Sequence, residues 1–136
     1  VAAEGIPVNL MMAPISGGLN DHEILEVGQR VSSLGAVSMA YTMVRLNGDV
    51  AAIFEDWIRK TMPDRADRVL NRIRDVHGGE LNDSRFGTRM RGEGQFAEVV
   101  KQQFQLARQR YFADKAKPAY NLDLFEQRRN HKMSLF

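Results

Sequence analysis

The chain has 136 residues, of which 43% are hydrophobic and 26% are charged, and it contains no cysteine. This composition is typical of one soluble globular domain without an apolar run long enough to cross a bilayer, so a cytoplasmic protein is expected. The missing cysteines exclude disulfides, thiolate catalysis and a cysteine-ligated zinc or iron–sulfur site within this chain. The net charge of +2 is unevenly spread, with 11 basic against 14 acidic residues in 1–100 and 8 against 3 in 101–136.

The first predicted elements are two strands separated by a helix. Residues 8–15 and 36–46 are nearly continuous apolar runs, which suit strands that are buried on both faces. Between them, Asn20 is expected to cap a helix together with Glu23, and Gly35 ends that helix. Its apolar residues recur at helical spacing: Ile24, Val27, Gly28, Val31 and Leu34. Strand, helix and strand in this order predict a βαβ unit with parallel strands.

Three more helices are expected downstream. The first starts after Asp49, and its predicted inner side, including two aromatic core anchors, consists of Ile53, Phe54, Trp57 and Ile58. Pro63 starts the second, whose stripe consists of Ala66, Val69, Leu70, Ile73 and Val76. The third runs from about residue 95 to 112, with an apolar side formed by Phe96, Val100, Phe104, Ala107 and Tyr111. After Pro118 the periodicity fades, and no element is predicted there.

Two doubly buried parallel strands are too few for a stable sheet, because such sheets need helices on both faces and normally several strands. The stretch from Val1 to Gly5 also resembles the end of a helix whose body precedes it. The chain is therefore expected to be the later part of a larger α/β domain. Its expected partners are the missing part of that domain or a second copy, which would pair through the exposed strand edges.

Three stretches carry a resemblance to a known family. They are GIPVNLMMAPISGGLND at 5–21, SRFGTRMRGEGQFA at 84–97 and the terminal MSLF. Together they resemble the C-terminal half of bacterial radical SAM proteins, in the group related to spore photoproduct lyase-type DNA-repair enzymes. The resemblance covers roughly residues 1–112 and the last few, and its most specific part is SRFGTRMRGEG.

The resemblance implies a fold and a cofactor. The fold would be α/β, the C-terminal portion of a partial (β/α)6 TIM-like barrel in which the two strands are the fifth and sixth. Residues 1–94 would belong to the barrel, and 95–136 would form a C-terminal helix and a basic tail. The parent would cleave S-adenosylmethionine at a [4Fe–4S] cluster and abstract hydrogen from an unknown substrate, for which nucleic acid is a candidate. The family's CxxxCxxC loop is absent here, so this fragment alone is expected to be inactive and to bind no cofactor.

The turn after the first strand is the expected cofactor-side region. By the resemblance, Ile15, Gly18 and Asn20 would contact S-adenosylmethionine, since barrel sites lie at the carboxyl ends of strands. The competing interpretation is that the glycines only form the turn and that Asn20 only caps the helix.

An arginine within the second apolar run also needs explaining. Arg45 and Tyr41 lie four residues apart, so they are expected on one face of the strand. Arg45 could hold a substrate anion at the barrel mouth, or it could form a structural bridge with Asp49 or Glu80.

The most unusual segment is an arginine- and glycine-rich loop between two helices. Arg85, Arg89 and Arg91 could bind a substrate anion, because each guanidinium matches a carboxylate or phosphate at two points. Alternatively, Asp83 and Glu93 could neutralise two of them and clamp the loop. The expectation is mixed: one arginine clamps the loop, and at least one faces a reactive cavity.

A different class of function remains open. The basic region from Lys101 to Lys132 could make the chain a non-enzymatic module that contacts nucleic acid or a protein partner. A solvated helix face and a loose tail would explain the same charge. The three histidines, His22, His77 and His131, show no spacing typical of a metal site.

Overall fold

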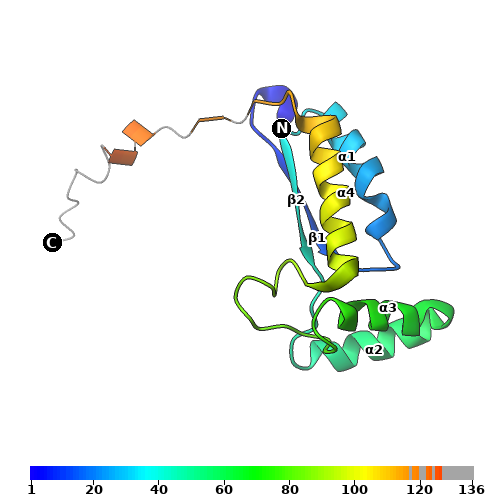
Figure 1. Ribbon diagram of the computed structural model, residues 1–136. Helices are drawn as coiled ribbons and strands as arrows, with labels where there is room; N and C mark the ends of the chain where they lie inside the picture. Colours follow the sequence, from blue (N-terminus) through cyan, green and yellow to red (C-terminus); the bar gives the residue numbers. More distant parts are fainter. Residues whose placement is uncertain (117, 120–121, 124, 127–136) are drawn as a thin grey trace.

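The structure is a computed structural model that describes residues 1–116, 118–119, 122–123 and 125–126. Within those residues, the strands are β1 (Asn9–Ile15) and β2 (Ser38–Met43), and the α-helices are α1 (Ile24–Ser33), α2 (Val50–Thr61), α3 (Pro63–Asp75) and α4 (Gly94–Phe112) (Figure 1). The chain is therefore α/β. The predicted strand–helix–strand unit and the three later helices are confirmed.

The two strands form a parallel pair. Leu10 pairs with Met39 and Met12 with Tyr41, but the register shifts before Ile15 pairs with Met43. Two residues of β1, Ala13 and Pro14, therefore lie opposite a single residue of β2. Such a bulge suits a proline, which has no N–H to donate to the ladder.

One face of the sheet packs against helices. The alternate residues Met39, Tyr41 and Met43 of β2 are buried in the main core cluster with residues from α1 and α4. The Tyr41 ring stacks on Phe104 of α4 with centroids 4.2 Å apart. Helices α1 and α4 also pack closely: a Cβ on Gly28 of α1 would lie only 3.4 Å from Ala107 Cβ. These contacts place α4 against both β2 and α1 (Figure 1).

The opposite face of β1 is exposed, so the prediction that this strand is buried on both faces is wrong for the described residues. Asn9, Met11 and Ala13 are all exposed, and Met11 keeps 58% of its surface. The reason is that helices in the described part of the chain cover one face only. A strand whose sequence predicts burial on both faces is thus exposed on one of them.

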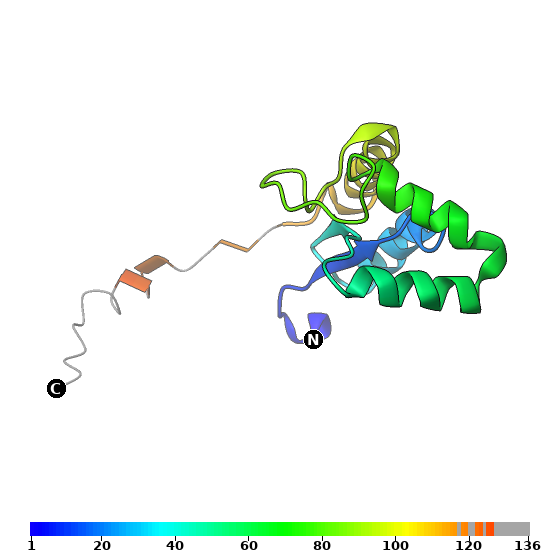
Figure 2. The same ribbon diagram turned by 90° about the horizontal axis from the view of Figure 1, so that it is seen from below.

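Helices α2 and α3 pack side by side as a second unit (Figure 2), which lies beside the carboxyl ends of the strands (Figure 1). Their cores contain Ile58 of α2 and all the predicted stripe residues of α3 from Ala66 to Ile73. The prediction for α2 is partly wrong, because Ile53 and Trp57 keep 66% and 43% of their surface. The apolar residues of α2 occupy more than one face, and only the side with Phe54 and Ile58 meets α3.

Candidate functional site

The turn that follows β1 is closed by the side chain of Asn20. Its Oδ1 accepts a hydrogen bond from the Ser16 amide at 2.8 Å, and its Nδ2 donates to the Pro14 carbonyl at 3.0 Å. The Gly18 amide donates to Asp21 Oδ1 at 2.7 Å. The predicted capping role of Asn20 is therefore wrong, since it makes no side-chain bond to the following helical turn. The amide is used to hold the turn in shape.

The other two residues predicted to contact a cofactor have different environments. Ile15 is fully buried in the main core, and its carbonyl accepts from the Val44 amide. Its side chain has no surface for a ligand. Gly18 is partly exposed with φ of +87°, a left-handed conformation that glycine adopts without strain. Gly18 and Asn20 are thus partly exposed on one turn, whose preceding residue Ile15 is buried.

The neighbouring Gly17 was not singled out from the sequence, yet it has the tightest surroundings. A Cβ at this position would lie 2.6 Å from Phe96 Cε1 and 2.9 Å from Arg72 Cβ. Glycine is therefore needed here because the chain passes close to a side chain of α4, and no local sequence pattern reveals that approach.

We expect Gly17→Ala to lower the free energy of unfolding by about 1–3 kcal/mol, because the added methyl overpacks the contact with Phe96. Urea denaturation measures this loss. The matched control is the same substitution in a Phe96→Leu background, where the smaller side chain leaves room and the loss should shrink. An equal loss in both backgrounds would show that Phe96 is not the cause and would leave the contact with Arg72 Cβ.

Asp83 is the centre of a hydrogen-bonded clamp in the arginine-rich loop. Its buried carboxylate accepts from Nε and Nη2 of Arg85, each at 3.0 Å, and from the Arg85 amide at 2.8 Å. Thr88 Oγ1 donates to the same carboxylate at 2.7 Å. The Arg85 side chain, then its amide and Thr88, hold the pKa of Asp83 well below the usual range of a carboxyl group.

Arg85 also bridges to the far end of the loop. Its Nη2 donates to Glu93 Oε1 at 2.5 Å, so one guanidinium joins Asp83 and Glu93. These two carboxylates raise the pKa of Arg85, with Asp83 the larger cause. The interpretation that Asp83 and Glu93 neutralise two arginines is therefore wrong in number, because both acids pair with Arg85 and together hold it within the loop.

Arg45 belongs to the same clamp, not to a bridge with Asp49 or Glu80. Its Nη1 donates to the Asp83 carbonyl at 3.3 Å. Arg45 and Tyr41 also do not share a strand face, because β2 ends at Met43 and Arg45 lies beyond it. The Tyr41 ring points toward α4. Arg45 therefore fastens the start of the loop to the chain that leaves β2.

Backbone hydrogen bonds hold the loop against the carboxyl end of β2. The Met43 amide donates to the Met90 carbonyl at 2.9 Å, and the Leu46 amide donates to the Leu81 carbonyl at 2.8 Å. The loop and the turn after β1 therefore lie at the same end of the sheet (Figure 1). This is the end at which parallel α/β proteins and barrels place their sites.

The remaining two arginines of the loop differ from Arg85. Arg89 lies 5.6 Å above the ring of the exposed Phe86, and Arg91 lies 4.9 Å above the ring of Tyr41. Neither forms an ion pair with a carboxylate among the residues that the structure describes. Arg91 lines a cavity to which Arg89 does not contribute, and this cavity lies beside α4 and not at the turn of residues 14–20.

Buried polar atoms near the strand ends were not foreseen from the sequence. His77, just after α3, donates from Nε2 to the Val44 carbonyl at 2.7 Å, and its buried Nδ1 has no partner in the described structure. Ser16 Oγ and Asn82 Oδ1 are also buried without a partner there. Each such atom needs a partner such as an ordered water or another polar group.

The described residues contain no cluster of three potential metal-binding side chains from His, Asp and Glu. None of the helices in the described ranges combines the length and apolar character that a bilayer span requires. In the basic region, Lys101 pairs with Glu98 and Lys115 donates to the Ser32 carbonyl. Its remaining part, residues 127–136 with the predicted contacts through Lys132 and the MSLF end, lies outside the described residues.

Comparison of the chain with protein-family models, with curated proteins and with solved structures gives no significant match.

Proposed function

We propose that this chain is the C-terminal part of a radical SAM enzyme and contributes the fifth and sixth strands of a partial (β/α)6 barrel. The observation that supports this most strongly is the one-sided cover of the parallel strands. Helices pack on the face with Met39, Tyr41 and Met43, while the face with Met11 and Ala13 is exposed. In a barrel, helices lie outside, and the other face of each strand lines the interior.

The strand ends support the same proposal. The turn closed by Asn20 and the loop clamped by Asp83 converge at the carboxyl end of the sheet, where barrel enzymes carry their sites. The unpartnered Ser16 Oγ and His77 Nδ1 are buried in this region. Residues from the rest of a barrel, or water that such a barrel encloses, would provide their hydrogen bonds.

The residues of this chain do not fit the iron–sulfur group that the proposal implies. The sequence has no cysteine, and no other metal-binding cluster is present in the described part of the chain. Under the proposal, polypeptide outside this chain holds the cluster and supplies the radical chemistry. This chain supplies one wall of the interior, and its Arg85 clamp fixes the loop at the mouth of that wall.

The proposal predicts a CxxxCxxC motif upstream in the open reading frame that encodes this chain. The whole encoded protein, reconstituted with iron and sulfide and reduced by dithionite without oxygen, should convert S-adenosylmethionine into 5′-deoxyadenosine and methionine. Replacing one motif cysteine with alanine is the matched control and should abolish that product. A reading frame without the motif, or a reconstituted cluster that never cleaves S-adenosylmethionine, would refute the proposal.

A second readout uses the exposed face itself. In the whole protein, Met11 would lie in the barrel interior, so Met11→Asp should lower the melting temperature strongly there. In the 136-residue chain alone, where Met11 is exposed, the same change should have little effect. Leu34→Asp, at an exposed position after α1, is the control and should be tolerated in both. Equal tolerance of Met11→Asp in both proteins would show that this face is not covered.

A further inference from the structure

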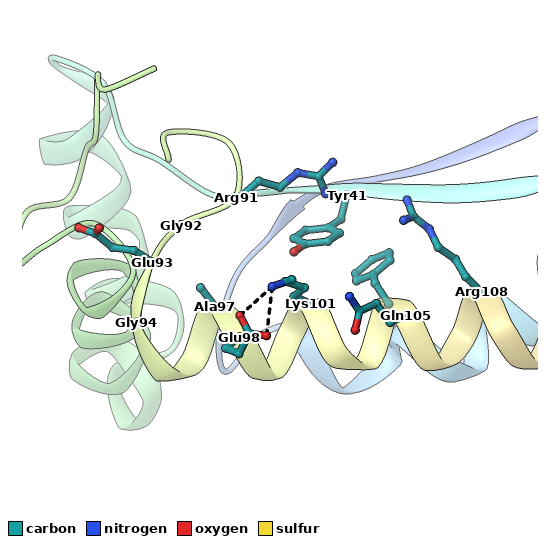
Figure 3. A pocket seen from close by; sticks show the side chains of 11 residues that line it. Tyr41, Arg91, Gly92, Glu93, Gly94, Ala97, Glu98, Lys101, Gln105 and Arg108 are labelled. Atoms are coloured by element: carbon teal, nitrogen blue, oxygen red, sulfur yellow. Dashed lines mark hydrogen bonds and ion pairs between the residues drawn. The ribbon is translucent and has the colours of Figure 1, made fainter. Parts of the chain in front are cut away.

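An open cavity of about 420 Å³ lies between the outer edge of β2, helix α4 and the end of the arginine-rich loop. Its size falls within the range of small-molecule sites. The polar and aromatic residues that dominate its wall are Tyr41, Arg91, Glu98, Lys101, Gln105 and Arg108 (Figure 3). The turn of residues 14–20 does not contribute to it, so this cavity is separate from the turn predicted to contact a cofactor.

The acidic groups beside the cavity are already paired. Glu98 accepts from Lys101 Nζ at 3.1 Å, and Glu93 accepts from Arg85, which lies outside the cavity. Arg91 and Arg108, in contrast, have no carboxylate within ion-pair distance among the described residues. Arg85 is shared between Glu93 and Asp83, so the acidic groups retain part of their charge, but Arg91 and Arg108 remain as two guanidiniums without an ion-pair partner among the described residues.

Both guanidiniums are held in place by contacts that leave hydrogen-bond donors available. Arg91 lies 4.9 Å above the Tyr41 ring, and stacking on an aromatic face leaves the N–H edges of the guanidinium open. Tyr41 is itself stacked on Phe104. Arg108 uses Nε to donate to the Met39 carbonyl at 2.9 Å, and its two terminal nitrogens have no hydrogen-bond partner among the described residues.

The two side chains approach from opposite ends of the cavity. Arg91 extends from the loop and Arg108 from α4, and Figure 3 shows them pointing toward each other on the side of Tyr41. Two fixed guanidiniums that converge on one space can bind the oxygens of a single anion, and little side-chain entropy is lost because both are already oriented.

We propose that this cavity binds a phosphate group, carried by a free nucleotide or by the phosphorylated end of a single nucleic-acid strand. A phosphate monoester has a charge near −2 at neutral pH, which balances the two guanidiniums, and each guanidinium matches two of its oxygens. A carboxylate would neutralise only one of them. The proposal concerns the residues of this chain alone and does not depend on a radical reaction.

Isothermal titration of the whole encoded protein tests the proposal and separates the two sources. The probes are inorganic phosphate, adenosine 5′-monophosphate, adenosine, and one oligonucleotide with and without a 5′-phosphate. The phosphorylated probe of one pair should bind at least about tenfold more tightly than its unphosphorylated counterpart. Preference within the nucleoside pair identifies a nucleotide site, and preference within the oligonucleotide pair alone identifies a strand end. Equal affinity within both pairs would overturn the proposal.

Single substitutions then locate the binding. Arg91→Gln should weaken binding of the preferred probe by about tenfold or more, because each charge-assisted pair contributes strongly. Arg89→Gln is the matched control in the same loop, since Arg89 does not line the cavity, and it should leave affinity within about twofold. Equal losses in both variants would indicate general attraction to a basic surface and would contradict the proposed site.

Arg108→Gln provides an independent second position, with Arg110→Gln as its exposed control on the same helix. Arg108 also bonds the sheet edge, so the melting temperature of each variant is measured with its affinity. Arg108→Lys separates charge from shape, because lysine keeps the positive charge but lacks the planar guanidinium that can donate two parallel hydrogen bonds. This variant should bind phosphate less tightly than the native protein. Phosphate affinity unchanged in a folded Arg91→Gln protein would exclude the site whatever Arg108→Gln does.

Discussion

Phe104→Ala is expected to lower the free energy of unfolding by about 3–5 kcal/mol, the cost of deleting a large buried aromatic side chain. Phe104 keeps only 1% of its surface and stacks on Tyr41 with centroids 4.2 Å apart. Because domains of this size are stable by about 5–15 kcal/mol, the variant should lose a large part of its stability. Urea denaturation followed by circular dichroism measures the change.

Two companion variants isolate the cause. Phe104→Leu retains most of the apolar volume and loses the aromatic stack, so it should cost less than about 1.5 kcal/mol. Gln105→Ala, at the next and exposed position of α4, should change stability by less than about 0.5 kcal/mol. If Phe104→Ala cost no more than Gln105→Ala, the packing of α4 on β2 would be wrong. The cavity wall formed by Tyr41 would then lose its support.

Asp83→Asn is expected to open the arginine-rich loop without unfolding the protein. The neutral amide cannot accept the four hydrogen bonds that Arg85 and Thr88 now donate to the carboxylate. Hydrogen exchange of the amides in residues 83–94 should accelerate by about tenfold or more, while amides of α1 and α4 keep their protection. Asp114→Asn, at an exposed position after α4, is the control and should leave the loop unchanged.

The same clamp predicts a pH dependence with a definite sign. The pKa of Asp83 is lowered in the folded protein, mainly by Arg85. A carboxyl group whose folded-state pKa is depressed contributes its stability in full above its unfolded pKa, near pH 4, and loses it as the pH falls toward the folded value. The protection factors of the loop amides, which correct for the pH dependence of intrinsic exchange, should therefore fall below about pH 4 in the native protein. In Asp83→Asn this acid-induced loss of protection should be absent, and its persistence there would assign the effect to another group.

The sequence predicts the elements well wherever one periodic pattern leads to one partner surface. The two strands and the stripe of α3 from Ala66 to Ile73 are confirmed as elements, although β1 is buried on one face only and not on both as its apolar run predicts. The pattern of α2 is broader, and period alone does not decide between the side with Ile58 and the side with Ile53 and Trp57. That choice depends on which face α3 covers, which is a tertiary contact.

The site shows a similar limit. Charge pairing within the loop could be predicted from Asp83 and Glu93, but the sequence does not say which arginine they hold, since three are within reach. The position of Arg91 over Tyr41 depends on two segments 50 residues apart in the chain. Arg108 was considered only as part of a basic region, because nothing near it in sequence indicates that it reaches the Met39 carbonyl. Asn20 is a residue type typical of helix caps, yet its side-chain amide bonds the backbone of the preceding turn and not the following helical turn.

The two borders of the sheet differ in their capacity to accept another strand. The Val44 amide bonds β1, so by alternation the backbone groups of Met43 and Met39 point to the outer edge of β2. There the Met43 amide bonds the Met90 carbonyl, and the Met39 carbonyl accepts from Arg108. Within the described ranges, no comparable hydrogen bonds cover the outer edge of β1 at residues 9–13. A further strand can therefore pair only with the β1 edge. Two isolated copies that met through β1 would form a four-stranded dimer with both remaining borders blocked, so their association would stop at two instead of propagating into fibres.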